Sequence, residues 1–208
     1  MSPLPTQMTN QWHERPGQRP GRELYHWHML FHDQPRVHEL AAAAQNKLAG
    51  QEGLDIIGMS WLHMTTYVAG FADEVPESAV DAMTADARGR LSQMEPIPVS
   101  LGRVFYASNA IVLPVEPSGA LTPVHDAVRV ATQAAGCAGH SATDPWLPHV
   151  SVAYSNATIP AAPIIAALGR SLPQTEIAIR SISLVAQTQV GRSWRWRPMA
   201  EVRLGQAA

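Results

Sequence analysis

The sequence predicts an α/β fold of the α+β type, in which two similar strand-helix-strand lobes flank a central cleft. A motif of histidine, any residue and a hydroxyl residue occurs at His63 and Thr65 and again, 86 residues later, at His149 and Ser151. A strand-like apolar run and a helical stretch precede each copy. The motif histidine follows the start of that helix by 27 residues in one half and by 28 in the other. This matched spacing indicates a duplicated structural unit.

The predicted elements follow the same order in both halves. The first half contains a strand at 24–31, a helix at 36–48, the motif strand at 61–71, a helix at 77–94 and a strand at 97–106. The second contains a strand at 110–115, a helix at 121–135, the motif strand at 148–155, a helix at 161–172 and strands at 176–189 and 194–204. Pro76 and Pro160 mark first turns of helices, where proline is tolerated. Gly191 suits the turn of a final hairpin.

Composition indicates one bilobal domain over residues 23–204. The chain has 208 residues, of which 46% are apolar, and this is enough to bury a core. Residues 1–22 are rich in Pro, Gln and Gly and predict a disordered tail, and residues 205–208 predict a short C-terminal tail. No apolar stretch approaches the ~20 residues that cross a membrane, so a cytoplasmic location is expected. The expected oligomeric state is a monomer. The lone Cys137 excludes an internal disulfide and is interpreted as structural.

The charge of the chain argues against long nucleic acids as partners. Net charge is −2 and Lys47 is the single lysine, so a broad basic surface is missing. A small or terminal phosphodiester remains a suitable ligand, since one anion needs only a few convergent donors.

The two motifs provide the residue types that phosphodiester chemistry needs. Because side chains of a strand alternate between faces, His63 shares a face with Thr65, and His149 shares one with Ser151. Each motif thus offers an acid or base together with a hydrogen-bond donor. With a pKa near 6.5, one imidazole is expected to be neutral and the other protonated near neutral pH.

The paired motifs, their spacing and the approach Trp146-x-Pro148-His149 resemble the 2H phosphoesterase superfamily, which includes 2′-5′ RNA ligase-like proteins and cyclic nucleotide phosphodiesterases. The resemblance spans nearly the whole folded chain. It implies antiparallel-rich sheets, a pseudo-twofold axis, chemistry without a metal or other cofactor, a role in RNA processing, and a site formed by His63, Thr65, His149 and Ser151. Three positions depart from the family pattern. Thr66 stands where family members usually have an apolar residue, Tyr154 where they often have an arginine, and Asp144 where they often have a basic residue.

Other residues are candidates for substrate binding. Tyr67 is expected on the face of His63, Trp146 near the mouth of the cleft, and His28 on a strand beside the motif strand. His26 and His28 form an H-x-H pair that could begin a zinc site, but further ligands at supporting spacing are missing. In the final hairpin, Trp194 and Trp196 share a face. Packing of this Trp pair on a helix is the favoured interpretation, and a base-stacking strip is the alternative.

The function predicted from these residues is hydrolysis of a small nucleotide-like phosphodiester, either a 2′,3′-cyclic phosphate or a 2′-5′ linkage, by two-histidine acid/base catalysis without metal. The alternatives are a non-catalytic module that binds a nucleotide or RNA end, and a metal hydrolase built on His26 and His28. Asp144 is expected to favour protonated His149, which makes His149 the acid and His63 the base. Tyr154 is expected to face away from the cleft.

Overall fold

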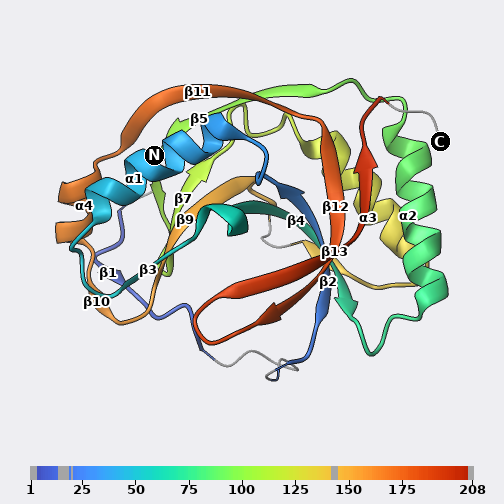
Figure 1. The fold of residues 1–208 in the computed structure, drawn as a ribbon, viewed down its shortest axis with the longest axis horizontal. Coiled ribbons are helices and arrows are strands. Elements are labelled where there is room, and N and C mark those ends of the chain that lie inside the picture. The colour runs from blue at the N-terminus through green and yellow to red at the C-terminus, as the bar shows by residue number, and fades with distance from the viewer. Residues whose placement is uncertain (1–3, 14–18, 20, 142–144, 206–208) are drawn as a thin grey trace.

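The computed structural model describes residues 4–13, 19, 21–141 and 145–205, which form two main sheets with helices on their outer sides. Figure 1 shows α1 (Pro35–Leu48) and α4 (Ala162–Leu168) on one side of the molecule. It shows α2 (Glu77–Leu91) and α3 (Thr122–Ala134) on the other side. The predicted mixed fold with antiparallel sheets is confirmed.

The first sheet has five strands in the order β13-β12-β2-β4-β8, and each neighbouring pair is antiparallel. Its strands are β2 (Leu24–Leu30), β4 (His63–Phe71), β8 (His140–Ser141), β12 (Ser181–Gln189) and β13 (Trp194–Arg203). The predicted hairpin of β12 and β13 is present. Its turn contains Gly191 at φ 57°, a left-handed conformation that glycine adopts without steric cost.

The second sheet has four strands in the order β3-β9-β7-β6. They are β3 (Leu54–Ile56), β9 (His149–Ser155), β7 (Ala110–Pro114) and β6 (Phe105–Tyr106). A bridge between Ser100 and Glu116 attaches β5 (Ile97–Arg103) beside this sheet, and β11 (Ser171–Ile179) pairs with β5. The central strands β4 and β9, one from each sheet, contact each other near the middle of the molecule (Figure 1).

The two motif strands share an irregularity at the same place. The register between β2 and β4 skips Thr66, and the register between β7 and β9 skips Val152. Each bulge directly follows the motif hydroxyl residue, Thr65 or Ser151. An extra residue in one strand interrupts the alternation of side chains, so the faces are exchanged beyond the bulge. These matching bulges support the inferred duplication.

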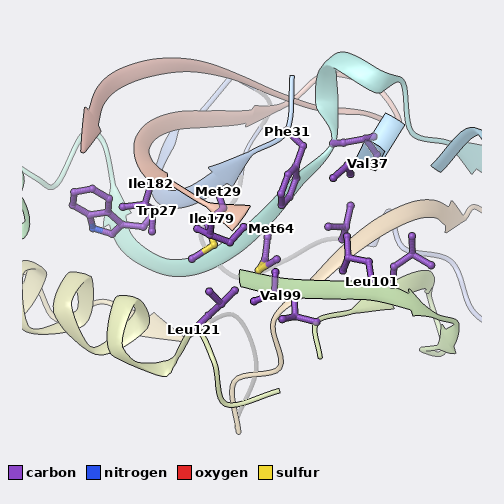
Figure 2. Packing of buried hydrophobic residues seen from close by; sticks show 14 of the residues in the cluster. Trp27, Met29, Phe31, Val37, Met64, Val99, Leu101, Leu121, Ile179 and Ile182 are labelled. Atoms are coloured by element: carbon purple, nitrogen blue, oxygen red, sulfur yellow. The ribbon is translucent and has the colours of Figure 1, made fainter. Parts of the chain in front are cut away.

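The middle residue of each motif anchors its strand in the hydrophobic core. Met64 and Val150 are both 0% exposed. Figure 2 shows Met64 in the core near Met29, its partner across the β2–β4 ladder. Because neighbouring side chains in a strand point to opposite faces, burial of Met64 turns His63 and Thr65 toward the other face of the sheet.

The first helix of each half packs on strands of the other half. α1 follows β2 but contacts β9, β11 and α4, whereas α3 follows β7 but contacts β4 and α2. Both helices bury apolar residues at helical spacing, which fixes the face that each presents to its sheet. These residues include Val37, Leu40, Ala41, Ala44 and Leu48 in α1, and Val124, Ala127, Val128 and Ala131 in α3. The halves are therefore interlocked.

The expectation of a disordered tail over residues 1–22 is wrong for residues 4–13. β1 (Gln7–Met8) pairs antiparallel with β10 (Ile159–Pro160), and the side chain of Met8 is fully buried. The indole N–H of Trp12 donates to Asp55 Oδ2 at 2.7 Å. Apolar burial and these bonds offset the cost of ordering a segment rich in polar residues. Residues 1–3, 14–18, 20 and 206–208 lie outside the described residues.

Several predicted boundaries also need correction. The expected strand at 176–189 is two strands, β11 and β12, which are separated by Arg180. Pro160 lies in β10, and α4 has Pro163 in its first turn. A 3₁₀ turn at Met59–Trp61 precedes β4, so the first motif stands at the beginning of its strand. Among the described helices, none is long and apolar enough to cross a membrane.

Candidate active site

Both motifs line one cavity between the two sheets. The cavity has a volume of about 660 Å³, and its walls include His63, Thr65, His149 and Ser151. The first pair comes from the start of β4 and the second from the start of β9. The structure thus brings together all four residues that the sequence singles out. A volume of this size lies within the usual range for small-molecule sites.

The hydrogen bonds of the two motif histidines define which ring nitrogen is available. His63 Nδ1 lies 2.9 Å from the carbonyl oxygen of Trp61, and His149 Nδ1 lies 2.7 Å from that of Leu147. A carbonyl oxygen only accepts, so both Nδ1 atoms carry a proton and donate it. In a neutral ring Nε2 is then the basic atom, and in a protonated ring Nε2 can donate. Both rings therefore keep Nε2 for proton transfer.

Burial lowers the pKa of both motif histidines. The pKa of His63 falls to about 4 because its ring is removed from water, and repulsion from His149 contributes. Burial also lowers the pKa of His149, and in both cases the bond to the backbone carbonyl opposes the shift. Both rings are thus neutral near pH 7 in the free protein. This differs from the expectation that one of them is protonated. Asp144, on which part of that expectation rested, lies outside the described residues.

His28 lies behind the first motif and contacts both of its functional residues. Its ring is fully buried and stacks on His63 with centroids 4.4 Å apart, and its Nε2 lies 3.2 Å from Thr65 Oγ1. His28 Nδ1 is buried without a hydrogen-bond partner among the described residues. A buried N–H without an acceptor is costlier and rarer than an unused lone pair, so we assign the proton to Nε2. Thr65 then accepts from His28, and its own hydroxyl proton can point into the cavity.

The second motif lacks an equivalent of His28. Thr65 pairs with His28 across the first ladder, whereas Ser151 pairs with Val112 across the second. The pKa of His28 is held well below its ordinary value by burial, with repulsion from His63 and His26. The first motif therefore stands against a neutral imidazole and the second against an aliphatic side chain. At this position the two halves differ, so the pseudo-twofold symmetry does not hold there.

Two predictions about side-chain direction are wrong, and the bulges explain both. Tyr67 lies beyond the bulge at Thr66, so it shares a face with core residues. Its hydroxyl donates to the carbonyl of Ala138 at 3.3 Å. Tyr154 lies beyond the bulge at Val152 and lines the cavity instead of facing away from it. The bulges therefore remove one expected aromatic residue from the site and add another.

Trp146 links the two motifs and lies outside the set of residues that form the cavity wall. Its indole N–H donates to the backbone carbonyl of Thr65 at 3.1 Å, and its ring stacks on His125 with centroids 4.6 Å apart. His125 Nε2 in turn lies 2.9 Å from Ser141 Oγ. Trp146 thus ties the chain just before the second motif to the backbone of the first.

The two tryptophans of the final hairpin lie beside the site, so the expectation that they pack on a helix is wrong. Trp194 lines the cavity, and Trp196 contacts His63 edge to face with centroids 4.7 Å apart. A second hollow of about 530 Å³ adjoins the first and shares His63, Tyr154 and Trp194 with it. Arg192 and Arg195 of the hairpin face this second hollow. The guanidinium of Arg195 lies 4.3 Å from the ring centroid of Trp61.

The N-terminal segment supplies cavity residues that sequence reasoning missed. Gln11 and His13 both line the cavity. The aromatic ring of Trp12 lies 5.5 Å from Tyr154 and 5.7 Å from Trp194, measured between centroids. The apolar residues Leu4, Met8 and Trp12 within a polar segment are sequence features that could have indicated docking.

The electrostatic character of the cavity comes mainly from imidazoles. Of the described residues, those that line it include His13, His26, His63, His140 and His149, and no Asp, Glu, Lys or Arg. Groups of three or more His, Cys, Asp or Glu suited to hold a metal ion are not found within the described parts of the chain.

Comparison with known proteins shows the family to which this chain belongs. The family model of the 2′-5′ RNA ligase superfamily matches residues 32–191, most of the chain. The protein belongs to this superfamily, and the resemblance to 2H phosphoesterases is confirmed. Membership indicates phosphoesterase or RNA ligase-like activity. No curated protein matches the sequence significantly.

Solved structures share the fold at low sequence identity. TT0787 of Thermus thermophilus matches with a TM-score of 0.64 and 15% identity over 89% of this chain and 100% of that one. Escherichia coli LigT complexed with 3′-AMP matches with a TM-score of 0.62 and 17% identity over 89% of this chain and 99% of LigT. The MHV ns2 PDE domain matches with a TM-score of 0.55 and 8% identity over 86% of this chain and 99% of that domain.

Proposed function

We propose that the protein is a metal-independent phosphoesterase that hydrolyses a small nucleotide-like phosphodiester, either a 2′,3′-cyclic phosphate or a 2′-5′ linkage. One observation carries the proposal: two hydroxyl residues and two histidines, whose Nε2 atoms have no hydrogen-bond partner among the described residues, line one cavity. The structures of LigT with 3′-AMP, NADP+ and ATP support a small nucleotide as ligand.

In the proposed reaction, His63 Nε2 removes a proton from water as the water oxygen bonds to phosphorus. The bond from phosphorus to the ribose oxygen breaks, and this oxygen takes a proton from His149 Nε2. Thr65 and Ser151 donate to the non-bridging oxygens, where negative charge increases in the transition state. The product is a phosphomonoester with a free ribose hydroxyl. Each general acid or base contributes ~10²–10⁴-fold.

The environments of the two rings support this assignment of roles. His63 stacks on neutral His28 and has a pKa of about 4, which favours the neutral form that a base requires. His149 lacks a stacked imidazole partner among the described residues. The negative charge of a bound phosphodiester raises the pKa of a nearby imidazole, so substrate binding favours the protonated form of His149.

The test combines a substrate panel with two substitutions. Wild-type protein, His63→Ala and His149→Ala are assayed with 2′,3′-cyclic nucleotides and 2′-5′ dinucleotides, with and without EDTA, and phosphorus NMR identifies the product. We expect turnover that survives EDTA and falls at least ~100-fold in either variant. His32→Ala is the matched control because His32 is exposed outside the cavity.

Three outcomes would contradict the proposal. Retention of more than a tenth of the activity by either variant would refute the two-histidine mechanism. Loss of turnover in EDTA would favour a metal hydrolase. Nucleotide binding without turnover of any panel member would favour a non-catalytic binding module.

A further inference from the structure

Residues 4–13 build one wall of the cavity although they lie outside the matched family region. β1 holds the segment against β10, and the backbone N–H of Gln11 donates to the carbonyl of Ser155 at 2.8 Å. The family model begins at residue 32, so its match does not include this wall. Gln11 is only 7% exposed and still lines the cavity, which means that its amide is held in place there.

Gln11 forms a pair with a second amide from the second sheet's β6–β7 loop. Asn109 Nδ2 donates to Gln11 Oε1, and Asn109 also lines the cavity. The backbone carbonyl of Asn109 accepts from Ser155 N at 2.9 Å, so Ser155 anchors both members of the pair. Each amide group has a carbonyl oxygen and an NH₂ group. One bond between two amides uses an acceptor of one and a donor of the other.

The two groups of the pair that this bond does not use are one NH₂ group and one carbonyl oxygen, namely Gln11 Nε2 and Asn109 Oδ1. Rotating both amides by 180° exchanges these roles but again leaves one donor and one acceptor. The Watson–Crick edge of each nucleobase also presents a donor next to an acceptor. Proteins commonly read an unstacked base by bonds to this edge together with stacking on aromatic side chains. Phe105, Tyr154 and Trp194 line the same cavity and provide such rings.

We propose that the Gln11–Asn109 amide pair binds the hydrogen-bonding edge of a nucleobase and thereby makes the enzyme selective for nucleosidic phosphodiesters. This inference rests on the proposed function, because it assigns the base subsite of the same cavity. The phosphodiester lies at the motif histidines and the base lies against the N-terminal wall. Selectivity comes from the base edge, since a phosphodiester without a base cannot use the pair.

The experiment compares two substrates that carry the same cyclic phosphate. One is a nucleoside 2′,3′-cyclic phosphate, and the other is methyl riboside 2′,3′-cyclic phosphate, which has no base. The variants Gln11→Glu and Asn109→Asp preserve side-chain shape but leave only acceptors facing the base. We expect each variant to raise KM for the nucleoside substrate about tenfold more than KM for the methyl riboside, because the added carboxylate repels the phosphate of both substrates alike, and we expect little change in kcat.

Added negative charge and loss of folding are controlled separately. Gln93→Glu and Asn46→Asp introduce the same charge at exposed positions outside the cavity and should leave both substrates unaffected. Thermal unfolding of every variant verifies that the fold is kept. If Gln11→Glu is unstable, Gln11→Met, which removes the amide without adding charge, replaces it.

The outcomes separate the inference from the proposed function. Equal effects on both substrates, or a wild-type enzyme that does not prefer the nucleoside substrate, would overturn the base subsite and leave the phosphoesterase proposal intact. Failure of the wild-type protein to hydrolyse these cyclic phosphates and the 2′-5′ dinucleotides of the first panel would overturn both.

Discussion

His28 and Val112 stand at equivalent positions of the two halves and give the motif hydroxyls different neighbours. Thr65 is held by an imidazole, whereas Ser151 faces an aliphatic side chain across its ladder. A hydroxyl that already accepts from a buried N–H has its own proton available for a substrate oxygen. We therefore interpret His28 as a positioning residue for Thr65, which replaces its sequence-based assignment as a substrate contact.

Substitution of His28 by phenylalanine tests this interpretation. The phenyl ring can still stack on His63 but cannot donate to Thr65, so kcat should fall about 10- to 100-fold while KM changes little. In a double-mutant cycle, Thr65→Ala should then cause little further loss, because the same interaction has already been removed. Additive losses in the cycle would show that His28 acts independently of Thr65.

The lowered pKa values of the motif histidines predict an acidic optimum. The base His63 must be neutral, so the acid limb of kcat/KM should lie near pH 4. The acid His149 must be protonated, and its lowered pKa places the alkaline limb below pH 6.5. Because bound phosphodiester raises the pKa of His149, the alkaline limb of kcat should lie at higher pH. Initial rates from about pH 3.5 to about pH 8.5 measure both limbs, and an optimum above about pH 7 in kcat/KM would contradict the assignment.

At the scale of the elements, the β-bulge directly after each motif decides which of the next residues in that strand enters the cavity. The bulges at Thr66 and Val152 exchange the strand faces directly after each motif. Val68 and Tyr154 consequently line the cavity, whereas Tyr67 joins the core side. A motif and its bulge thus form one unit of six consecutive residues, three of which line the cavity. These three are the histidine, the hydroxyl residue and the third residue after the hydroxyl residue.

Substitution of Tyr67 tests whether the bulge turns the side chain of this residue away from the cavity. Tyr67→Phe should leave KM and kcat unchanged, since the hydroxyl contacts the carbonyl of Ala138 outside the cavity. Loss of this half-buried hydrogen bond should lower the free energy of unfolding by about 1 kcal/mol. Steady-state kinetics and urea denaturation measure the two effects. A several-fold rise in KM would show that Tyr67 contacts the substrate after all.

The order of the elements and the convergence of the motifs could be predicted from the sequence, because apolar periodicity and the repeated spacing report local structure. The bulges could not, since no residue type at Thr66 or Val152 distinguishes them from regular strand positions. The roles of Gln11 and His28 depend on partners 98 and 37 residues away, Asn109 and Thr65. Such contacts arise only from the tertiary fold.

At the scale of the whole molecule, Asp55 connects three distant parts of the chain. It accepts from the indole of Trp12 and from Asn156 Nδ2, and it forms an ion pair with Arg192 at 3.4 Å. The N-terminal segment, the end of β9 and the β12–β13 hairpin therefore meet at this residue of β3. The ring of Trp12 lies between Tyr154 and Trp194, which come from different sheets.

Replacement of Trp12 should therefore destabilise the protein although the residue lies outside the matched family region. Trp12→Ala removes apolar contacts and a hydrogen bond, and it should lower the free energy of unfolding by about 2–4 kcal/mol. Trp12→Phe retains most ring contacts and should lower it by about 1 kcal/mol. Urea denaturation monitored by circular dichroism provides the values. Unchanged stability of Trp12→Ala would mean that the segment does not contribute to folding.

The exchange of helices between the two halves has a consequence for how the chain folds during synthesis. α1, complete by residue 48, packs on β11, which begins at residue 171. The sheet of β2 and β4 likewise depends on α3 and on β12, both of which come from the second half. When only the first copy of the duplicated unit has been synthesised, its helix and strands therefore lack the elements of the second half on which they pack. Because loop closure over such distances is slow, we expect folding to await nearly the entire polypeptide and then to proceed as one cooperative transition.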